Sequence, residues 1–149
     1  MNCQHPTLAI AGTLSLLAAA LHVAIIFGGA AWYRLFGAGE SMARAAERGS
    51  ASPAITTSVI TVLLTLCGLY ALSGAGAIGR LPLVRPALVL ITTVYLGRGL
   101  LGFFALRLTD NAYIHELSFR FWFVSSLVIT TVGAIHAVGI YDAWTDLGS

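Results

Sequence analysis

The stretch LVRPALVLITTVYLGRGLLGFFAL, residues 83–106, decides the fold class of this chain. Its only charged residues are Arg85, close to its start, and Arg98. An α-helix rises about 1.5 Å per residue, so about 20 such residues cross the roughly 30 Å of hydrocarbon in a bilayer. Lipid offers the backbone no hydrogen-bond partners. The segment must therefore pair its own N–H and C=O groups, which predicts a transmembrane helix.

Three further apolar stretches, residues 8–31, 53–72 and 119–143, have a similar length and character. They are continuous runs, whereas transmembrane β-strands are alternating segments of about ten residues. We therefore predict an all-α polytopic membrane protein, a four-transmembrane-helix bundle that forms a single domain over residues 1–149. An even number of spans places both termini on the same side of the membrane.

The overall composition agrees with this class. Hydrophobic residues make up 58% of the 149 residues and charged residues 9%, against about 25% charged in soluble domains. This excludes a soluble globular monomer and a disordered chain. A net charge of +2 is too small to hold a polyanion, so no nucleic-acid partner is expected. Cys3 and Cys67 form no Cys-x-x-Cys motif, and a disulfide-exchange role has no support.

The longest connection, residues 32–52, contains a charged segment with helical spacing. Glu40 and Arg44 stand four residues apart and Arg44 and Glu47 three apart, which predicts two ion pairs on one helix face. Residues 39–48 therefore form either a short helix on the membrane surface, ended by Gly49, or a solvated loop.

Local signals place two of the helix starts. Ser52 followed by Pro53 predicts the N-cap and first position of the second span. Asp110 and Asn111 predict a capped turn that leads into the fourth span. The arginine count in the loops favours a cytoplasmic long loop, but Glu40 and Glu47 accompany two of those arginines, and the orientation stays open.

Small and polar residues recur on one face of each span, as membrane helices show where they face one another. These residues are Gly12, Ser15, Ala19, His22 and Gly29; Thr57, Thr61 and Thr65; Tyr95, Arg98, Gly99 and Gly102; and Ser126, Gly133 and His136. The pattern predicts a polar seam inside the bundle. For the Thr and Gly positions, simple packing explains it.

Three ionisable residues, His22, Arg98 and His136, lie well inside the spans, with Tyr95 close by. Counted from the face that carries the termini, helix rise places His22 about 21 Å deep, Arg98 about 20 Å and His136 about 10 Å. A central arginine costs about 2.5–3.5 kcal/mol on insertion scales. His22 and Arg98 are therefore expected to meet near the middle of the membrane.

Arg98 has no carboxylate at its own depth, because all six acidic residues lie in loops or at span ends. Three outcomes are open. The guanidinium can snorkel toward the loop, donate to backbone carbonyls and to neighbours such as Tyr95 or His22, or bind an anion that is not part of this chain.

Two histidines on two different spans also suggest that the chain could bind haem b through both imidazole rings. That ligation needs both rings at one depth, and their depths differ by about 10 Å. We predict no cofactor, with haem b as the alternative. His115 and Glu116 alone do not define a metal site. No catalytic residues are assigned, because the chain has no phosphate-binding loop and no Ser/His/Asp set.

The runs WYRLFGAGE, residues 32–40, and GLYALSGAG, residues 68–76, resemble small uncharacterised four-span proteins of bacterial inner membranes. The resemblance implies an integral protein of the bacterial inner (plasma) membrane with four spans. It implies no activity and no site residues.

Together these features predict a non-enzymatic binding or accessory protein. Its intramembrane polar pocket would be formed by His22, Tyr95, Arg98 and His136 and would hold a lipid-like or small anionic ligand. The expected partners are membrane lipid and further copies of the chain in a homo-oligomer, because small-residue faces favour close helix contact. The alternatives are an oligomeric small-solute transporter or channel, and a membrane redox protein or enzyme that uses His22 and His136.

Overall fold

The computed structural model describes residues 4–148, apart from the side chain of residue 113, and within that range all regular structure is helical. The predicted all-α fold is confirmed. The long helices are α1 (Pro6–Leu35), α3 (Ser52–Gly74), α4 (Val84–Gly102) and α7 (Phe119–Asp142). The short ones are α2 (Glu40–Glu47), α5 (Ala105–Leu108), α6 (Ala112–Glu116) and the 3-10 turn η1 (Asp146–Gly148).

The four long helices match the four predicted spans. Each is long and apolar enough to cross a membrane, so the chain has the character of a polytopic membrane protein. Their surfaces carry many exposed large apolar side chains, among them Phe27, Leu90 and Leu101. In water such an apolar surface would favour aggregation, whereas lipid solvates it.

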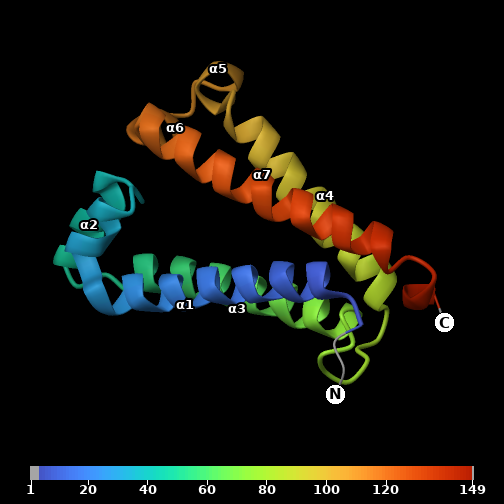
Figure 1. The fold of residues 1–149 in the computed structure, drawn as a ribbon. Coiled ribbons are helices and arrows are strands. Elements are labelled where there is room, and N and C mark those ends of the chain that lie inside the picture. Colours follow the sequence, from blue (N-terminus) through green and yellow to red (C-terminus); the bar gives the residue numbers. More distant parts are fainter. Residues whose placement is uncertain (1–3, 149) are drawn as a thin grey trace.

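The long helices are arranged as two pairs. α1 packs most extensively against α3, and α4 packs most extensively against α7. Figure 1 shows that the pairs meet near the two chain ends and diverge toward α2 and α6. The bundle is therefore closed at one end and splayed at the other.

The main apolar core lies at the closed end, where all four long helices meet. Leu8 of α1 and Leu88 of α4 are completely buried there, together with Ala71 of α3. The rest of this core comes from Ala75, Val84, Ile140, Ala143 and Leu147. Small residues alternate with leucines, which lets the four helix ends pack closely.

Glycines set the closest helix approaches. A Cβ at Gly12 would lie 2.9 Å from the carbonyl oxygen of Gly68, so α1 and α3 touch backbone to backbone at this point. A Cβ at Gly139 of α7 would lie 2.8 Å from Cγ of Leu8. The small-residue faces seen in the sequence thus serve packing at these positions, as predicted.

The chain ends are tied together at the closed end. The imidazole Nε2 of His5 lies 3.1 Å from a carboxylate oxygen of Asp146. Arg80 donates to the carbonyl oxygens of Asp146 and Leu147 at 3.1 and 2.7 Å. Both described ends of the chain therefore lie at the same end of the molecule (Figure 1), as four spans require.

The predicted helix over residues 39–48 exists as α2, and its predicted Glu40–Arg44 pair forms at 3.1 Å. The predicted Arg44–Glu47 pair makes no direct salt bridge among the described residues, although the charge of Arg44 still favours ionised Glu47. Arg34 donates to both carboxylate oxygens of Glu40 at 2.8 and 2.9 Å and to Glu47 at 2.6 Å. A guanidinium with several donors can bridge two carboxylates, and Arg34 lies between them.

Helix ends differ from the predicted boundaries where local geometry intervenes. α4 stops at Gly102, four residues before the predicted end at 106, and α1 continues past 31 to Leu35. Gly29 interrupts α1 with a φ of 61°, a conformation that other residues rarely adopt. The side-chain cap of α7 is Ser118, whose hydroxyl accepts from the N–H of Phe121 at 3.1 Å.

The second span also starts one residue earlier than predicted. Ser52 is already the first helical residue of α3, and no side chain caps this end. The hydroxyl of Ser50 accepts from the N–H of Ser52 at 3.3 Å instead. After Asn111 the chain forms the short helix α6 before α7 begins.

Candidate functional site

The four predicted site residues come from three of the long helices: His22 from α1, Tyr95 and Arg98 from α4, and His136 from α7. Along their helices they lie between the apolar core at the closed end and the splayed end. The structure joins Tyr95 to His136, sets Arg98 one helical turn further along α4, and leaves His22 apart.

Tyr95 stands where all four long helices come together. Its hydroxyl lies 3.0 Å from the hydroxyl of Ser15 on α1 and near the Cys67 thiol on α3. Its ring meets the His136 ring of α7 edge-on, with 5.1 Å between centroids and 64° between planes. One side chain thus connects the two helix pairs.

Gly133 makes this arrangement possible. A Cβ at this position would lie 3.1 Å from both the Tyr95 Cβ and the Leu96 backbone nitrogen. α7 can therefore approach α4 closely only because residue 133 has no side chain. The close approach brings His136, one turn further along α7, against the Tyr95 ring.

His136 is completely buried. Its Nδ1 lies 2.9 Å from the carbonyl oxygen of Val132. A carbonyl only accepts, so Nδ1 carries the proton, and Nε2 of the neutral ring is left as an acceptor. No described residue donates to that Nε2. Most buried polar atoms in proteins have a partner, so this nitrogen marks an unusual position.

Arg98 is half-buried, and its Nη1 is fully enclosed. Its guanidinium lies over the Trp122 ring of α7, with 4.8 Å from Cζ to the ring centroid. Among the described residues, no hydrogen-bond acceptor engages Nη1 and no carboxylate pairs with Arg98. A guanidinium remains charged under all ordinary conditions, so the site carries an uncompensated positive charge.

Ser126 and Gly102 complete the surroundings of Arg98. A Cβ at Gly102 would lie 2.2 Å from the Ser126 hydroxyl and 2.3 Å from Nη1 of Arg98. The Ser126 hydroxyl is fully buried and also has no partner among the described residues. Two donors of different chemistry thus pack against one glycine.

Further unpartnered groups continue this line along the contact between α4 and α7. The described residues with such a buried atom are Thr92, Arg98, Ser126, Thr130 and His136. They form a polar row, which we define by these five residues. It runs from the splayed end, at Arg98, toward the apolar core, at Thr92 and His136. The predicted polar seam is thus concentrated within one helix pair.

His22 does not join the other three residues. It is half-buried, and its Nδ1 bonds to the carbonyl oxygen of Ala18 at 2.7 Å. Among the described residues, no hydrogen bond or ring contact connects it to Tyr95, Arg98 or His136. It lies two turns beyond Ser15 on the same face of α1, in the part of the molecule where the pairs diverge.

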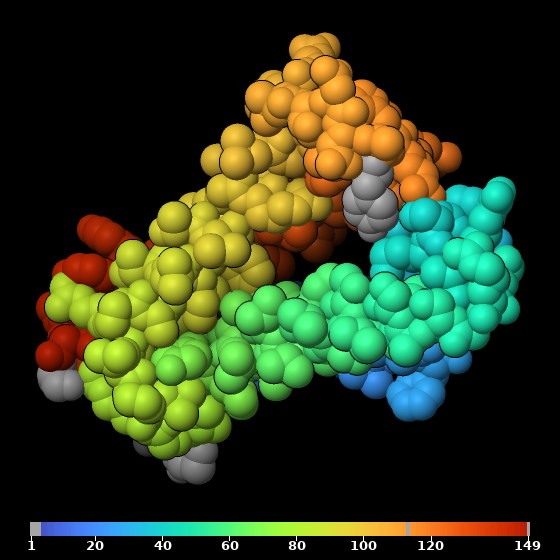
Figure 2. Space-filling view, turned by 180° about the vertical axis from the view of Figure 1, so that it is seen from behind, coloured from blue at the N-terminus to red at the C-terminus, as the bar shows by residue number. Residues whose placement is uncertain are grey.

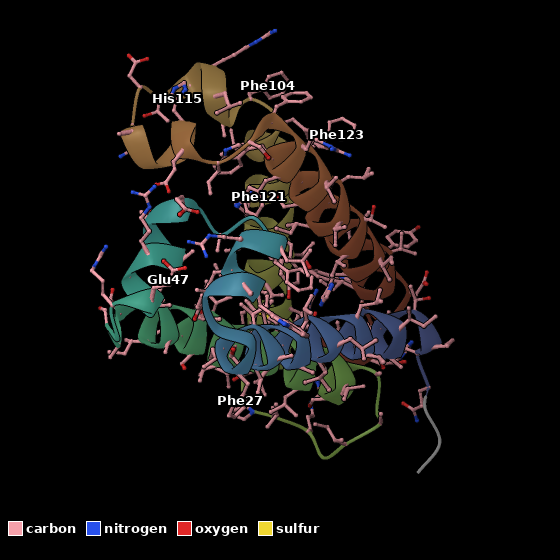
Figure 3. All side chains as sticks on the ribbon, turned by 90° about the vertical axis from the view of Figure 1, so that its left-hand side faces the viewer. Phe27, Glu47, Phe104, His115, Phe121 and Phe123 are labelled. Atoms are coloured by element: carbon pink, nitrogen blue, oxygen red, sulfur yellow. The ribbon has the colours of Figure 1, made fainter. Side chains whose placement is uncertain are left out.

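The divergence leaves a hollow between the pairs. Figure 2 shows it between α3 in green and α4 in gold, with α2 and α6 at one end. At that end Glu116 of α6 accepts from the backbone N–H of Ser41 in α2. Gly37 lies directly against the Phe121 ring, which Figure 3 shows between α2 and α7. The splayed end is therefore bridged, and the hollow opens sideways.

A charged network holds α2 at this end. Arg34 hydrogen-bonds Glu40 and thereby lowers the pKa of that carboxyl to about 2, with a smaller contribution from Arg44. Hydrogen bonding from Arg34 also lowers the pKa of Glu47. Both carboxylates accept charge-assisted hydrogen bonds that favour their ionised form. Both carboxylates pair with Arg34, and neither pairs with Arg98.

Two of these participants were not predicted from the sequence. Trp122 is not among the residues of the predicted seam, yet its ring faces Arg98, and Cys67 was considered only for disulfide exchange. Ser126 was predicted on the polar face of its span, but not as a neighbour of Arg98. Trp122 and Ser126 are four residues apart on one face of α7, and this spacing was the available signal. Nothing in the sequence placed Cys67 near Tyr95.

Comparisons with protein-family models, curated protein sequences and solved structures find no match to this chain.

Proposed function

We propose that this chain is a non-enzymatic binding or accessory protein of the bacterial inner membrane, and that it holds an oxyanion at Arg98. The ligand is either the anionic headgroup of a lipid-like molecule or a small free anion. The observation that carries the proposal is the enclosed, unpartnered Nη1 of Arg98 beside the unpartnered Ser126 hydroxyl.

The energetic argument starts from the charge. A buried guanidinium without a partner is strongly unfavourable, and the Trp122 ring compensates only part of the lost hydration. An oxyanion supplies both the opposite charge and several acceptor sites. It could accept from Nη1 and from the Ser126 hydroxyl together, in charge-assisted hydrogen bonds stronger than neutral ones.

The sideways hollow supports a lipid-like ligand. An amphiphile can enter it from the bilayer with its tail still in an apolar environment (Figure 2). Its headgroup then binds Arg98 of α4. Exposed apolar residues on both pairs, such as Ile60 and Leu101, keep the surroundings compatible with acyl chains.

Native mass spectrometry from mild detergent tests the proposal. The matched variants are Arg98→Gln and Arg107→Gln, which remove the same charge from the site and from an exposed position. One sample is exchanged into phosphatidylglycerol and a second into inorganic phosphate. Wild-type protein and Arg107→Gln should retain one of these probes about tenfold better than Arg98→Gln, because a charge-assisted hydrogen bond contributes about 1.5–3 kcal/mol.

The arms of this experiment separate the two sources. Retention of phosphatidylglycerol in the first sample without retention of phosphate in the second identifies a headgroup ligand, and retention of inorganic phosphate in the second identifies a free anion. Equal retention by all three proteins contradicts the proposal. A retained haem with a Soret absorption band would replace it with the redox alternative at His22 and His136.

The polar row gives one observation in favour of a transporter or channel. It extends over several turns of α4 and α7, although the apolar core closes it toward the chain ends. Anion flux into liposomes that is lost in Arg98→Ala would support this second function. Ligand retention without flux would support binding alone.

A further inference from the structure

A second arginine of α4 lies at the opposite end of the helix. Arg85 is thirteen residues before Arg98, or about 20 Å along the axis. Its guanidinium stacks on the ring of Trp144, with 3.6 Å from Cζ to the ring centroid. Trp144 belongs to the C-terminal segment, which folds back beside the start of α4 (Figure 1).

The guanidinium is held from two sides. Trp144 covers one face, and a Cβ at Gly148 would lie 2.9 Å from Nη1 of Arg85, so the C-terminal backbone packs closely against it. Stacking on a ring fixes the orientation of the guanidinium plane and does not occupy its N–H groups. The position of this side chain is therefore fixed while its donors stay available.

Arg85 has no acidic partner among the described residues. The two acids of this end are engaged elsewhere, since Asp142 accepts from Thr7 at 3.4 Å and Asp146 pairs with His5 at 3.1 Å. The first turn of α4 contains no acidic residue. Positive charge is thus concentrated at the start of this helix, where the helix dipole is positive as well.

A shallow, open apolar groove lies beside this arginine. It is lined by Arg85, Pro86, Val89, Leu90, Thr93 and Trp144. The Thr93 hydroxyl is already bonded to the carbonyl oxygen of Val89 at 2.8 Å, so it presents no free donor. Leu90 is 65% exposed along this side of a helix that can span a membrane.

We propose that this groove is a binding site for one anionic phospholipid, with the phosphate on Arg85 and an acyl chain along Val89 and Leu90 beside Trp144. Charge complementarity selects the headgroup, because a fixed guanidinium binds phosphate in a forked geometry. The direction of the groove along an apolar helix selects an acyl chain. Tryptophan at a membrane interface favours this depth.

The site is distinct from the one proposed at Arg98. Arg85 and Trp144 lie outside the α4–α7 contact that holds the polar row. A ligand here remains at the edge of the bilayer, whereas a ligand at Arg98 lies between the helix pairs. Each site can therefore be lost without the other.

The test counts lipids on protein exchanged into phosphatidylcholine nanodiscs that contain a minor fraction of phosphatidylglycerol, and then released for native mass spectrometry. Arg85→Gln should retain phosphatidylglycerol about tenfold less than wild type. Arg85→Lys, which keeps the charge and loses the fork, should fall between them. Arg107→Gln should retain the wild-type number of lipids. Arg98→Gln can lose a lipid only from its own site, so it should still retain the phosphatidylglycerol bound at Arg85.

Three results would overturn the proposal. Equal loss in Arg85→Gln and Arg107→Gln would show a diffuse effect of charge. Unchanged retention in both Arg85 variants would show that the arginine does not bind the headgroup. In a second sample that contains glycerol phosphate in place of phosphatidylglycerol, retention equal to that of the intact lipid would show that the groove holds no acyl chain. Size-exclusion profiles identical to wild type show that each variant is folded.

Discussion

Arg98 and Ser126 approach each other where Gly102 has no side chain, and Thr130 approaches α4 at Gly99 in the same way. Single missing methyl groups thus determine where polar side chains meet between two helices. The sequence predicted that Tyr95, Arg98, Gly99 and Gly102 share a helix face. It could not show which atom of the partner helix each one touches, because that depends on the rotation and depth of both helices.

Gly99 and Gly97 form a matched pair at the residue scale. A Cβ at Gly99 would lie 2.3 Å from the Thr130 hydroxyl and 2.8 Å from its backbone nitrogen, whereas nothing lies within 4 Å at Gly97. We expect Gly99→Ala to destabilise the fold by about 1–3 kcal/mol through overpacking. Gly97→Ala should be neutral or slightly stabilising.

Unfolding in mixed micelles, followed by circular dichroism, measures both changes. Equal stabilities for the two variants would mean that α4 and α7 do not approach each other as closely as the structure shows.

At the scale of single elements, the apolar runs predicted the four long helices because hydrogen bonding in lipid leaves the backbone little choice. The ends were less predictable. Ser118 caps α7 only after an intervening short helix, and Gly29 breaks α1 inside a continuous apolar run. The direct salt-bridge partner of Glu47 was mispredicted for a related reason. Sequence spacing considers only the charges on one helix, and Arg34 arrives from another.

The Arg34 network predicts that α2 loosens in acid. The pKa of Glu40 is about 2 in the folded protein, below its ordinary value of 4.5. Its contribution to stability is therefore complete above about pH 4.5 and is lost as the pH falls toward 2. The pKa of Glu47 is lowered too, so it acts in the same direction.

Hydrogen exchange of the α2 amides between pH 6 and pH 3, corrected for intrinsic rates, measures this effect. Protection should fall with acid in wild-type protein. In Glu40→Gln it should be lower at the outset and depend less on pH. Constant protection in wild-type protein would contradict the role given to these ion pairs.

At the scale of the whole molecule, the pairing of helices was beyond the sequence. Each span carries one face of small and polar residues, and these faces are too similar to select α1 with α3 or α4 with α7. A bundle was predicted, but not its opening toward one end. His22 shows the consequence, because equal depth with Arg98 does not produce contact when the helix pairs diverge.

The hydrogen bond between α2 and α6 should limit the distance between the two helix pairs at the splayed end. Glu116→Ala removes the acceptor of the Ser41 N–H and should broaden the distances between the pairs. Spin labels are attached at the exposed positions 48 and 110, with Cys3 and Cys67 replaced by serine. Double electron–electron resonance then measures the distribution of distances between the two labels.

Glu116→Gln keeps an acceptor oxygen and should preserve the wild-type distance distribution. A wild-type distribution in Glu116→Ala would show that the contacts of Gly37 with Phe121 and Gly39 with Leu117 hold the end without the carboxylate.

The division into two pairs also gives an order to biogenesis. Each pair is a hairpin of consecutive spans, so the contact between Gly12 and Gly68 can form once the first hairpin has left the translocon. The second hairpin then inserts next to a preformed neighbour. Tyr95 reaches Ser15 and Cys67 only at that step, which makes its hydroxyl a reporter of the final stage of assembly in the cell.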